Sequence, residues 1–448
     1  MEARARARAA RGYVDSGRER PVRWASQSAR WACVSGALVL LATGATAAVP
    51  AQASGSRSIE VVYRTPAALQ RALEREPAAL VRVVAPLHVA EVVPAGDSGT
   101  LLRGLRRQPG IVLVRPAVRR RVAAAAVAPA LTPGLLSTPD GGAYEWQYYV
   151  AGVDRVPDLV RAAARRFTIA IVDSGVDADA PALAGKIAGT YDVRSPRTAV
   201  SDSSGHGTFV ASLAAGSPAA GVAGFGGDAR ILVVKVGAAD SFDDIDVAAG
   251  IVYAVRHGAK IINLSMAGRT RSAVEASAIR YAAARGALVV AAAGNDAQNG
   301  NVPEYPAALL QPVGSSGSPG LGLAVGASDF SGRRAPFSEF GSFVSLAAPG
   351  ASVFGAVSAR SSLSRFPRTQ LPGSVGGSYG FASGTSFAAP EVAGAAALVW
   401  GAKPSLKASQ VARILEQTAS GHGSWNRDLG YGVIDVAAAV ELAEGGPL

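Results

Sequence analysis

Ser386 lies where a serine could act as a nucleophile. The segment FASGTSFAAP (381–390) is a turn of small residues that opens a long apolar helix, and the pattern predicts Ser386 at the first helical position. There a serine meets unpaired backbone N–H groups and the positive end of the helix dipole, which favour a developing oxyanion. The same residues would also suit an ordinary serine cap on a core helix. A catalytic serine therefore requires a base, and an acid that orients the base, elsewhere in the chain.

His206 and Asp173 are candidates for that base and acid. His206 lies between two glycines at the start of an alanine-rich helix predicted within 203–216, and the glycines let the backbone pack closely around the imidazole. Asp173 directly follows the apolar strand IAIV, and α/β folds place their chemistry at such strand ends. Alone, Asp173 would suit a turn, and a lone histidine is usually structural. The other histidines are predicted to be structural or exposed: His88, His257 and His422.

The body of the chain alternates strands with helices. Apolar runs predict strands at 229–236, 259–266 and 287–295, separated by helices at 243–258 and 270–286. This order indicates an α/β fold, a parallel sheet with helices on both faces. Later segments are predicted to be strands at 323–328 and 343–350, a long polar connection at 355–380, and helices at 387–400, 404–419 and within 429–443.

Residues 54–121 have a pattern of their own, which predicts a small α+β domain. Its elements are strands at 60–64, within 80–93 with a break at Pro86, and at 111–116, and helices at 66–76 and 98–110. The order βαββαβ is that of a ferredoxin-like fold. Residues 118–121 are expected to trail from the last strand, and the uncharged segment 122–139 to form a linker. The aromatic segment Tyr144–Val150 is expected to lie against the domain that follows.

The first 53 residues resemble a secretory leader. An arginine-rich start precedes an apolar run of 16 residues, Val34–Val49, and then an A-x-A site, so cleavage is predicted after about Ala53. A signal anchor is the alternative, but the run is short for a membrane span. Cys33, in the leader, is the single cysteine, so no disulfide is expected in the exported product. We expect a secreted, extracellular protein with no membrane span after leader removal.

The positive charge belongs to the N-terminal part of the chain. The net charge is +11, but residues 1–121 hold 20 Lys/Arg and 8 Asp/Glu, a balance of +12. The remaining residues hold 24 and 25, a balance of −1. No basic patch with interleaved aromatic residues occurs in the body, so nucleic acid is not an expected partner. The chain is long enough for a large core and for two or three domains.

Four motifs in fixed order carry a resemblance to a known family. AIVDSGVD (170–177), GHGTFVAS (205–212), AAAGN (291–295) and SGTSFAAP (383–390) resemble those of the subtilisin-like serine proteases, the subtilases. The likeness covers residues of about 140–440. It implies a subtilisin-like three-layer fold with a mostly parallel sheet at 140–448, preceded by the ferredoxin-like domain.

The resemblance also implies a role for each motif residue. Ser386 would be the nucleophile that forms an acyl-enzyme, His206 the general base and then acid, and Asp173 the residue that orients the imidazole. Asn295 would donate to the oxyanion together with the Ser386 N–H. Alone, Asn295 would suit a loop cap after a strand. Segments that would bind the substrate backbone and wall the P1 pocket are Ser265, Met266, Ala267 and Gly268, and Ala292, Ala293 and Gly294.

The N-terminal domain resembles the family's inhibitory propeptide, above all over 105–121. By that likeness it assists folding, and its tail lies in the active site until the chain cleaves itself within Arg119–Ala125. Glu304, just before a Tyr-Pro pair, corresponds to the base of the P1 pocket, where a carboxylate favours Lys or Arg. The alternative is that Glu304 points to solvent.

Several positions depart from the family pattern. Phe209 replaces a histidine and is expected to be structural, and Ala267 replaces the usual small Gly or Ser, which leaves the pocket width open. Ala182 stands where the family has an aspartate, and residues 217–224 lack the asparagine of a calcium loop. We therefore expect no tight calcium site, no other metal and no cofactor, and a monomer.

The pattern as a whole predicts a secreted, propeptide-regulated serine endopeptidase acting on proteins or peptides. One alternative is a catalytically silent relative that acts as a binding module, against which the complete Asp-His-Ser-Asn set argues. Another is an esterase of the α/β-hydrolase class, in which the nucleophile would precede the acid and the histidine in sequence.

Overall fold

The structure is a computed structural model that describes residues 58–122, 144–196, 199–238, 241–361, 368–369 and 378–446. Gly55–Leu448 form one compact unit. The predicted signal peptide and nearly all of the predicted linker lie outside the described residues. Within those residues, no helix is long and apolar enough to cross a membrane.

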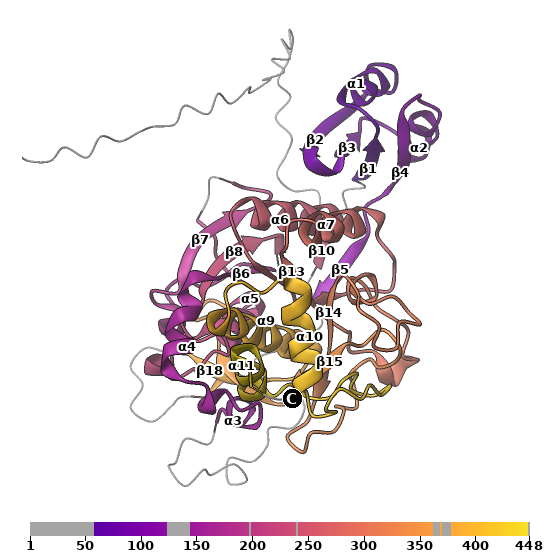
Figure 1. The fold of residues 1–448 in the computed structure, drawn as a ribbon. Coiled ribbons are helices and arrows are strands. Elements are labelled where there is room, and N and C mark those ends of the chain that lie inside the picture. Colours follow the sequence, from indigo (N-terminus) through magenta and orange to yellow (C-terminus); the bar gives the residue numbers. More distant parts are fainter. Residues whose placement is uncertain are drawn as a thin grey trace, which may run out of the picture. The chain divides into compact units, whose positions relative to one another are not determined.

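A seven-stranded sheet forms the centre of the body (Figure 1). Its order is β15-β14-β13-β11-β6-β8-β7, and every neighbouring pair is parallel. The strands are β6 (Thr168–Asp173), β7 (Ile187–Asp192), β8 (Arg230–Lys235), β11 (Ile261–Leu264), β13 (Leu288–Ala292), β14 (Gly322–Ser328) and β15 (Leu346–Pro349). The sheet confirms the predicted α/β fold.

Alternate residues of the central strands enter two different cores. Ile169 and Ile171 of β6 pack in the core that contains α5 and α9, whereas Ala170 and Val172 pack in the core that contains α6 and α7. Such strands are buried on both faces, which explains their continuous apolar runs. The helices of the first layer are α3 (Trp146–Val150), α4 (Asp158–Ala163), α5 (His206–Ala215), α9 (Thr385–Ala402), α10 (Ala408–Thr418) and α11 (Val436–Glu444). Those of the second are α6 (Asp244–Arg256), α7 (Ala273–Ala283) and α8 (Ala307–Leu310). The three predicted layers are thus present.

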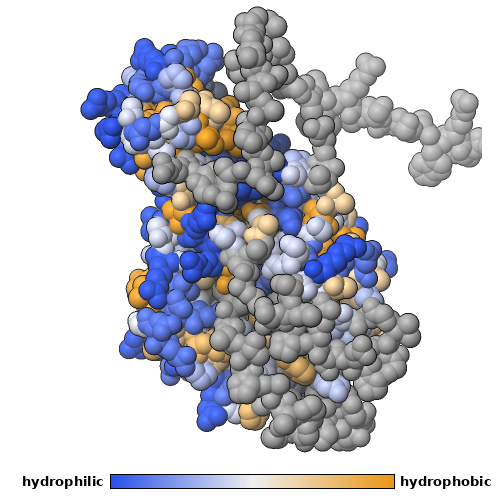
Figure 2. Space-filling model, turned by 180° about the vertical axis from the view of Figure 1, so that it is seen from behind, coloured by the Kyte–Doolittle hydropathy of each residue, from blue (hydrophilic) through white to orange (hydrophobic). Residues whose placement is uncertain are grey.

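The N-terminal module, residues 58–116, is a four-stranded antiparallel sheet with two helices. Its order is β2-β3-β1-β4. The elements are β1 (Ile59–Tyr63), α1 (Pro66–Arg75), β2 (Ala78–Val84), β3 (Val89–Pro94), α2 (Ser98–Arg106) and β4 (Ile111–Pro116), which confirms the βαββαβ prediction. The module has its own core, and Figure 2 shows apolar surface on it. Exposed apolar side chains lie on the edge strands: Leu80, Val81, Val83 and Val112.

Two small sheets outside the central sheet correct the sequence analysis. β5 (Arg119–Val122) was expected to be a trailing end, and Val122 to begin the linker; instead β5 is the inner strand of a sheet with β9 (Gly237–Ala238), β10 (Ser241–Asp243) and β12 (Met266–Ala267). The predicted polar connection at 355–380 also holds strand structure, namely the end of β16 (Val353–Ala356), β17 (Arg368–Thr369) and the start of β18 (Tyr379–Ala382). The β5 pairing is not visible locally, because both of its partner strands are remote in sequence.

Three smaller expectations have definite outcomes. The Tyr144–Val150 segment does pack on the body, since the indole N–H of buried Trp146 donates to the Ser352 carbonyl at 3.0 Å. The helix expected at 404 begins at Ala408, after a turn. His88 is structural, because it adopts a left-handed conformation and stacks on Tyr63 with ring centroids 5.5 Å apart.

Candidate active site

Asp173 and His206 form a buried hydrogen-bonded pair. Asp173 ends β6 and His206 begins α5, and Asp173 Oδ1 lies 2.8 Å from His206 Nδ1. Both side chains are almost fully buried. Oδ1 also accepts from the Ser174 N–H at 2.7 Å, which fixes the carboxylate orientation. Because the carboxylate accepts from Nδ1–H, Nε2 is left as the basic nitrogen of the imidazole.

The glycines around His206 are required by close backbone contacts. Gly205 has φ 83°, a left-handed conformation that turns the chain into α5. A Cβ on Gly207 would lie 2.0 Å from the Gly175 carbonyl oxygen. The start of α5 therefore packs directly on the loop after β6, and this contact brings His206 to Asp173.

Asp202 is a positioning residue that the sequence analysis missed. Its Oδ1 accepts from the Gly205 N–H and the Ser174 hydroxyl, both at 2.9 Å. Its Oδ2 accepts from the Thr208 N–H at 2.9 Å and the Thr208 hydroxyl at 2.7 Å. Asp202 thus joins the loop after β6 to the first turn of α5. An aspartate shortly before a predicted helix was an available signal for such a cap.

Ser386 lies in the first turn of α9, next to a residue that contacts the imidazole. The helix begins at Thr385, so Ser386 is its second residue and not its first as predicted. The neighbouring Phe387 ring lies 5.5 Å from the His206 ring. Nε2 of His206 is buried and makes no hydrogen bond within the described residues. The acceptor nitrogen is therefore available to a hydroxyl that turns toward it.

Ser386 and Ser265 hold each other in place. The Ser386 hydroxyl donates to the Ser265 carbonyl at 3.0 Å, and the Ser265 hydroxyl donates to the Ser386 carbonyl at 2.7 Å. The second bond is possible because Pro390, four residues later, has no N–H to donate to the Ser386 carbonyl. Pro390 therefore ties α9 to the strand region that contains Ser265.

Asn295 is oriented by the residue before Ser386. Its Oδ1 accepts from the Thr385 N–H at 2.9 Å and from the Thr385 hydroxyl at 3.1 Å. Gly294 donates its N–H to the same hydroxyl at 3.1 Å. These two bonds fix the side-chain amide with its oxygen toward Thr385, which makes the NH₂ its donor end.

β12, which contains two of the residues predicted to bind the substrate backbone, is paired with β5. β5 runs antiparallel to β12, with Arg121 opposite Ala267 and Val122 opposite Met266. A Cβ on Gly268 would lie 3.1 Å from the Arg119 carbonyl, so this glycine lets the two backbones approach. Ala292 and Ala293, from the second predicted segment, are buried in the core and do not pair with β5.

Glu304 faces Gly294, and a second carboxyl lies beside it. A Cβ on Gly294 would lie 2.2 Å from Glu304 Oε2 and 2.9 Å from Glu339 Cγ. Both glutamates are buried, so Glu304 does not point to solvent. Burial raises the pKa of Glu304 to about 7, and burial together with the Glu304 charge raises the pKa of Glu339 to about 8. Glu339 has no motif around it, so sequence reasoning had no signal for it.

The departures from the family pattern lie where their residue types suit them. Phe209 is buried in the core around α5 and α9, as expected for a structural residue. Ala182 is buried near the loop that holds Asp177 and Asp179. There Arg360 donates to Asp179 at 2.5 Å. Within the described ranges, no three His, Cys, Asp or Glu side chains converge as a metal site would require.

Comparison with known sequences adds to this geometry. The profile of the subtilase family matches residues 164–432, which span every residue of the predicted triad and Asn295. The chain belongs to the subtilase family. It is 34% identical to fervidolysin of Fervidobacterium pennivorans over 300 residues, covering 62% of this chain but 41% of fervidolysin. It is 35% identical to thermitase of Thermoactinomyces vulgaris over 263 residues, 57% of this chain and 83% of thermitase.

Solved structures agree on the subtilase fold. The crystal structure of fervidolysin, described as a keratinolytic enzyme related to subtilisin, has a TM-score of 0.74 and 26% identity. It covers 88% of this chain and 61% of that one. The epidermin leader peptide processing serine protease of Staphylococcus aureus has a TM-score of 0.65 at 19% identity, a likeness of fold. It covers 88% of this subtilase and all of that protein.

Proposed function

We propose that this subtilase is a secreted serine endopeptidase that acts through an acyl-enzyme. The main support is the buried Asp173–His206 pair. The Nε2 of His206 makes no hydrogen bond within the described residues, and Ser386 adjoins Phe387, whose ring lies near the imidazole. In the proposed reaction the Ser386 hydroxyl attacks the peptide carbonyl while Nε2 takes its proton. Asn295 and the Ser386 N–H donate to the oxyanion, and His206 returns the proton to the leaving amine. Water then hydrolyses the acyl-enzyme by the same steps, and Asp173 stabilises the imidazolium throughout.

We further propose that the chain is made as a zymogen with residues 54–121 as its inhibitor. The support is that β5 lies on β12, where a substrate backbone would pair, and that arginines of the N-terminal module meet buried acids of the body. Arg115 contacts Asp244 at 2.5 Å, and Arg82 contacts Asp246 at 2.5 Å. Arg115 also pairs with Glu60 of its own module at 2.7 Å. Such pairs would hold the module on the enzyme after the connection is cut.

Self-cleavage through Ser386 tests both proposals. Wild-type protein and Ser386→Ala, each expressed without the leader, are purified and their masses measured. We expect only the wild type to be cut within Arg119–Ala125, and a fluorophosphonate probe to label only the wild type. Two full-length proteins and an unlabelled wild type would instead indicate a silent scaffold.

We also propose that P1, the residue before the cleaved bond, is preferentially basic. The support is the buried pair of carboxyl groups, Glu304 and Glu339, beside Gly294, one of the residues expected to wall the P1 pocket. Because their pKa values are about 7 and about 8, both ionise as pH rises, so the preference for Lys over Leu should grow between pH 6 and 9. Glu304→Gln should reduce that preference about tenfold in kcat/KM. A preference for large apolar residues that Glu304→Gln leaves unchanged would end this proposal.

A further inference from the structure

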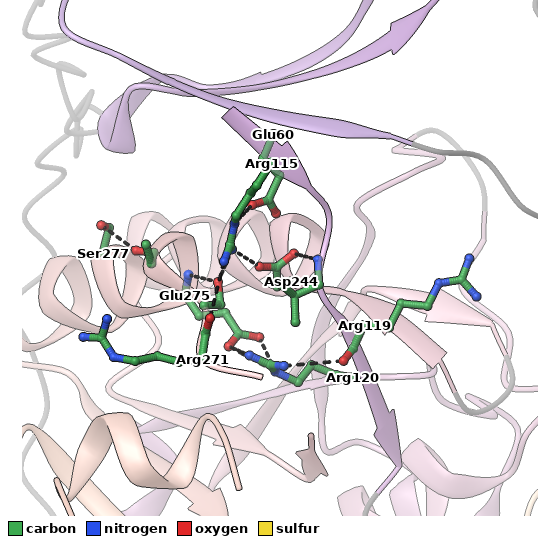
Figure 3. Close-up of polar contacts among 11 residues, drawn as sticks. Glu60, Arg115, Arg119, Arg120, Asp244, Arg271, Glu275 and Ser277 are labelled. Carbon is green, nitrogen blue, oxygen red and sulfur yellow. Dashed lines mark hydrogen bonds and ion pairs between the residues drawn. The ribbon is translucent and has the colours of Figure 1, made fainter. Parts of the chain in front are cut away.

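Arg120 is fully buried, unlike the arginines on either side of it. Its Nε lies 2.9 and 3.1 Å from the two carboxylate oxygens of Glu275, and its Nη2 lies 2.5 Å from Oε2 (Figure 3). Arg119 and Arg121, which alternate with it along β5, are exposed. Removing a guanidinium from water is unfavourable unless a carboxylate meets it with good geometry. The body therefore provides a specific binding site for this one side chain, the Glu275 carboxylate.

Glu275 belongs to the body of the enzyme and is fixed there independently of Arg120. It lies in the first turn of α7, and its N–H donates to the Ser272 hydroxyl at 3.0 Å. The positive end of the α7 dipole favours a carboxylate at this position. Glu275 would thus remain in place after the N-terminal module leaves, ready for another cation.

The strand register relates this binding site to the bond that would be cut. β5 pairs with β12 so that Arg121 faces Ala267 and Val122 faces Met266. A peptide bound in this register and continued by one residue would have that residue opposite Ser265. The Ser265 carbonyl is the group to which the Ser386 hydroxyl donates, so that residue lies at the nucleophile and corresponds to P1. Counting back from P1, the Val122 position is P2, the Arg121 position P3 and the Arg120 position P4.

We infer that Glu275 makes this enzyme selective for arginine at P4, the fourth residue before the cleaved bond. The inference rests on the proposed peptidase function and deepens it. The guanidinium uses two nitrogens against two oxygens, a planar arrangement that an ammonium group cannot reproduce. The order at P4 is therefore arginine, then lysine, then neutral side chains. Arg120 of the chain itself satisfies this rule, whereas the residue after Val122 is Ala123, so the chain's own site would meet the P4 preference and not the proposed P1 preference.

The test compares peptides that differ only at P4. Self-processed wild type, titrated with a fluorophosphonate, is assayed on internally quenched peptides carrying arginine, citrulline, lysine or leucine at P4. Citrulline has the shape of arginine without its charge. We expect kcat/KM to be roughly 30-fold or more higher for arginine than for citrulline, as for other buried charge pairs. Glu275→Gln should bring that ratio to within a few-fold.

The controls separate the possible outcomes. Glu416→Gln removes another buried glutamate, on α10, which is not an element of the sheet that contains β5. This substitution should leave the arginine-to-citrulline ratio unchanged. Equal cleavage of the arginine and citrulline peptides by titrated wild type would overturn the inference while leaving the peptidase function intact. This comparison needs no variant, so it decides the matter even if Glu275→Gln fails to fold. A wild type that neither reacts with the probe nor cleaves any peptide would overturn the proposed function, and the inference with it.

Discussion

Two regions of the molecule are held together in different ways. One is the region of the proposed triad, and the other is the docking region, where Arg115 of β4 and Arg120 of β5 meet acids of the body. Asp173 and His206 are 33 residues apart, and glycine contacts and short hydrogen bonds from neighbouring loops bring them together. Arg120 and Glu275 are 155 residues apart, and a single buried ion pair joins them. The geometry of the Asp173–His206 pair is thus built into local backbone structure. Recognition, by contrast, depends on charges that meet only when distant segments pack.

The two regions should therefore respond differently to substitution. Loss of a group of the proposed triad should change the reaction and leave the packing intact. A lost arginine of the docking region leaves a buried carboxylate without its partner, which weakens the association of two parts of the molecule. The predictions below test this contrast, beginning with the largest effect.

Asp173→Asn should reduce kcat/KM for a peptide by about 10⁴-fold, because an amide can stabilise the imidazole tautomer that carries its proton on Nε2. The folded structure should remain, since the amide still fits among the same donors and acceptors. Peptide kinetics and thermal unfolding measure the two effects. The control is Asp179→Asn, whose carboxylate is exposed beside Arg360. If Asp173→Asn lost activity only through unfolding, the contrast between the regions would fail.

Arg115→Ala should weaken the hold of the cleaved N-terminal module by roughly 10²-fold, because Asp244 and Glu60 would both lose their guanidinium. The self-processed complex is diluted, and the return of peptidase activity gives its dissociation constant. Arg119→Ala is the matched control, since Arg119 is exposed and 3.7 Å from Asp243. An exposed pair contributes about 1 kcal/mol or less, so its effect should be within a few-fold. Equal effects of the two substitutions would show that buried charge does not govern docking.

Glu391 sharpens the comparison, because it is a buried acid on α9 that has no hydrogen-bond partner among the described residues. Burial raises its pKa well above the usual value. The folded protein therefore keeps a proton that the unfolded chain loses above about pH 4.5, so this group lowers stability as pH rises, by at most about 1.4 kcal/mol per pH unit. In a Ser386→Ala background, Glu391→Gln should match its parent near pH 5 and become more stable than it by pH 8.

Thermal or denaturant unfolding across that pH range measures the effect. Glu441→Gln, on an exposed part of α11, is the control and should follow the parent at every pH. A stability difference for Glu391→Gln that stays constant with pH would contradict the prediction.

The sequence was informative where a function depends on neighbouring residues. Local patterns indicate where elements end: an apolar strand before Asp173, glycines around His206 and small residues before Ser386. The sheet, the helices and the pairing of Asp173 with His206 could therefore be predicted. Asp202 could have been found by the same logic.

The docking region could not be predicted in this way. Glu275 and Glu339 stand in ordinary helical and loop sequence, and only packing brings Arg120 to one and Glu304 to the other. β5 looked like a loose end because both of its partner strands lie more than 100 residues away. Charge pairs and edge pairings of this kind leave no periodic signal.

The inner position of β5 in its small sheet has a consequence for the targets of this enzyme. With β5 released, as the zymogen proposal requires, the edges of β10 and β12 are separated by the width of one strand, and an extended backbone is what fits between them. A helix or an already paired strand cannot enter. A folded protein would therefore be cut only while one of its segments is locally open, so its lifetime would be set by its own opening equilibrium as well as by its sequence.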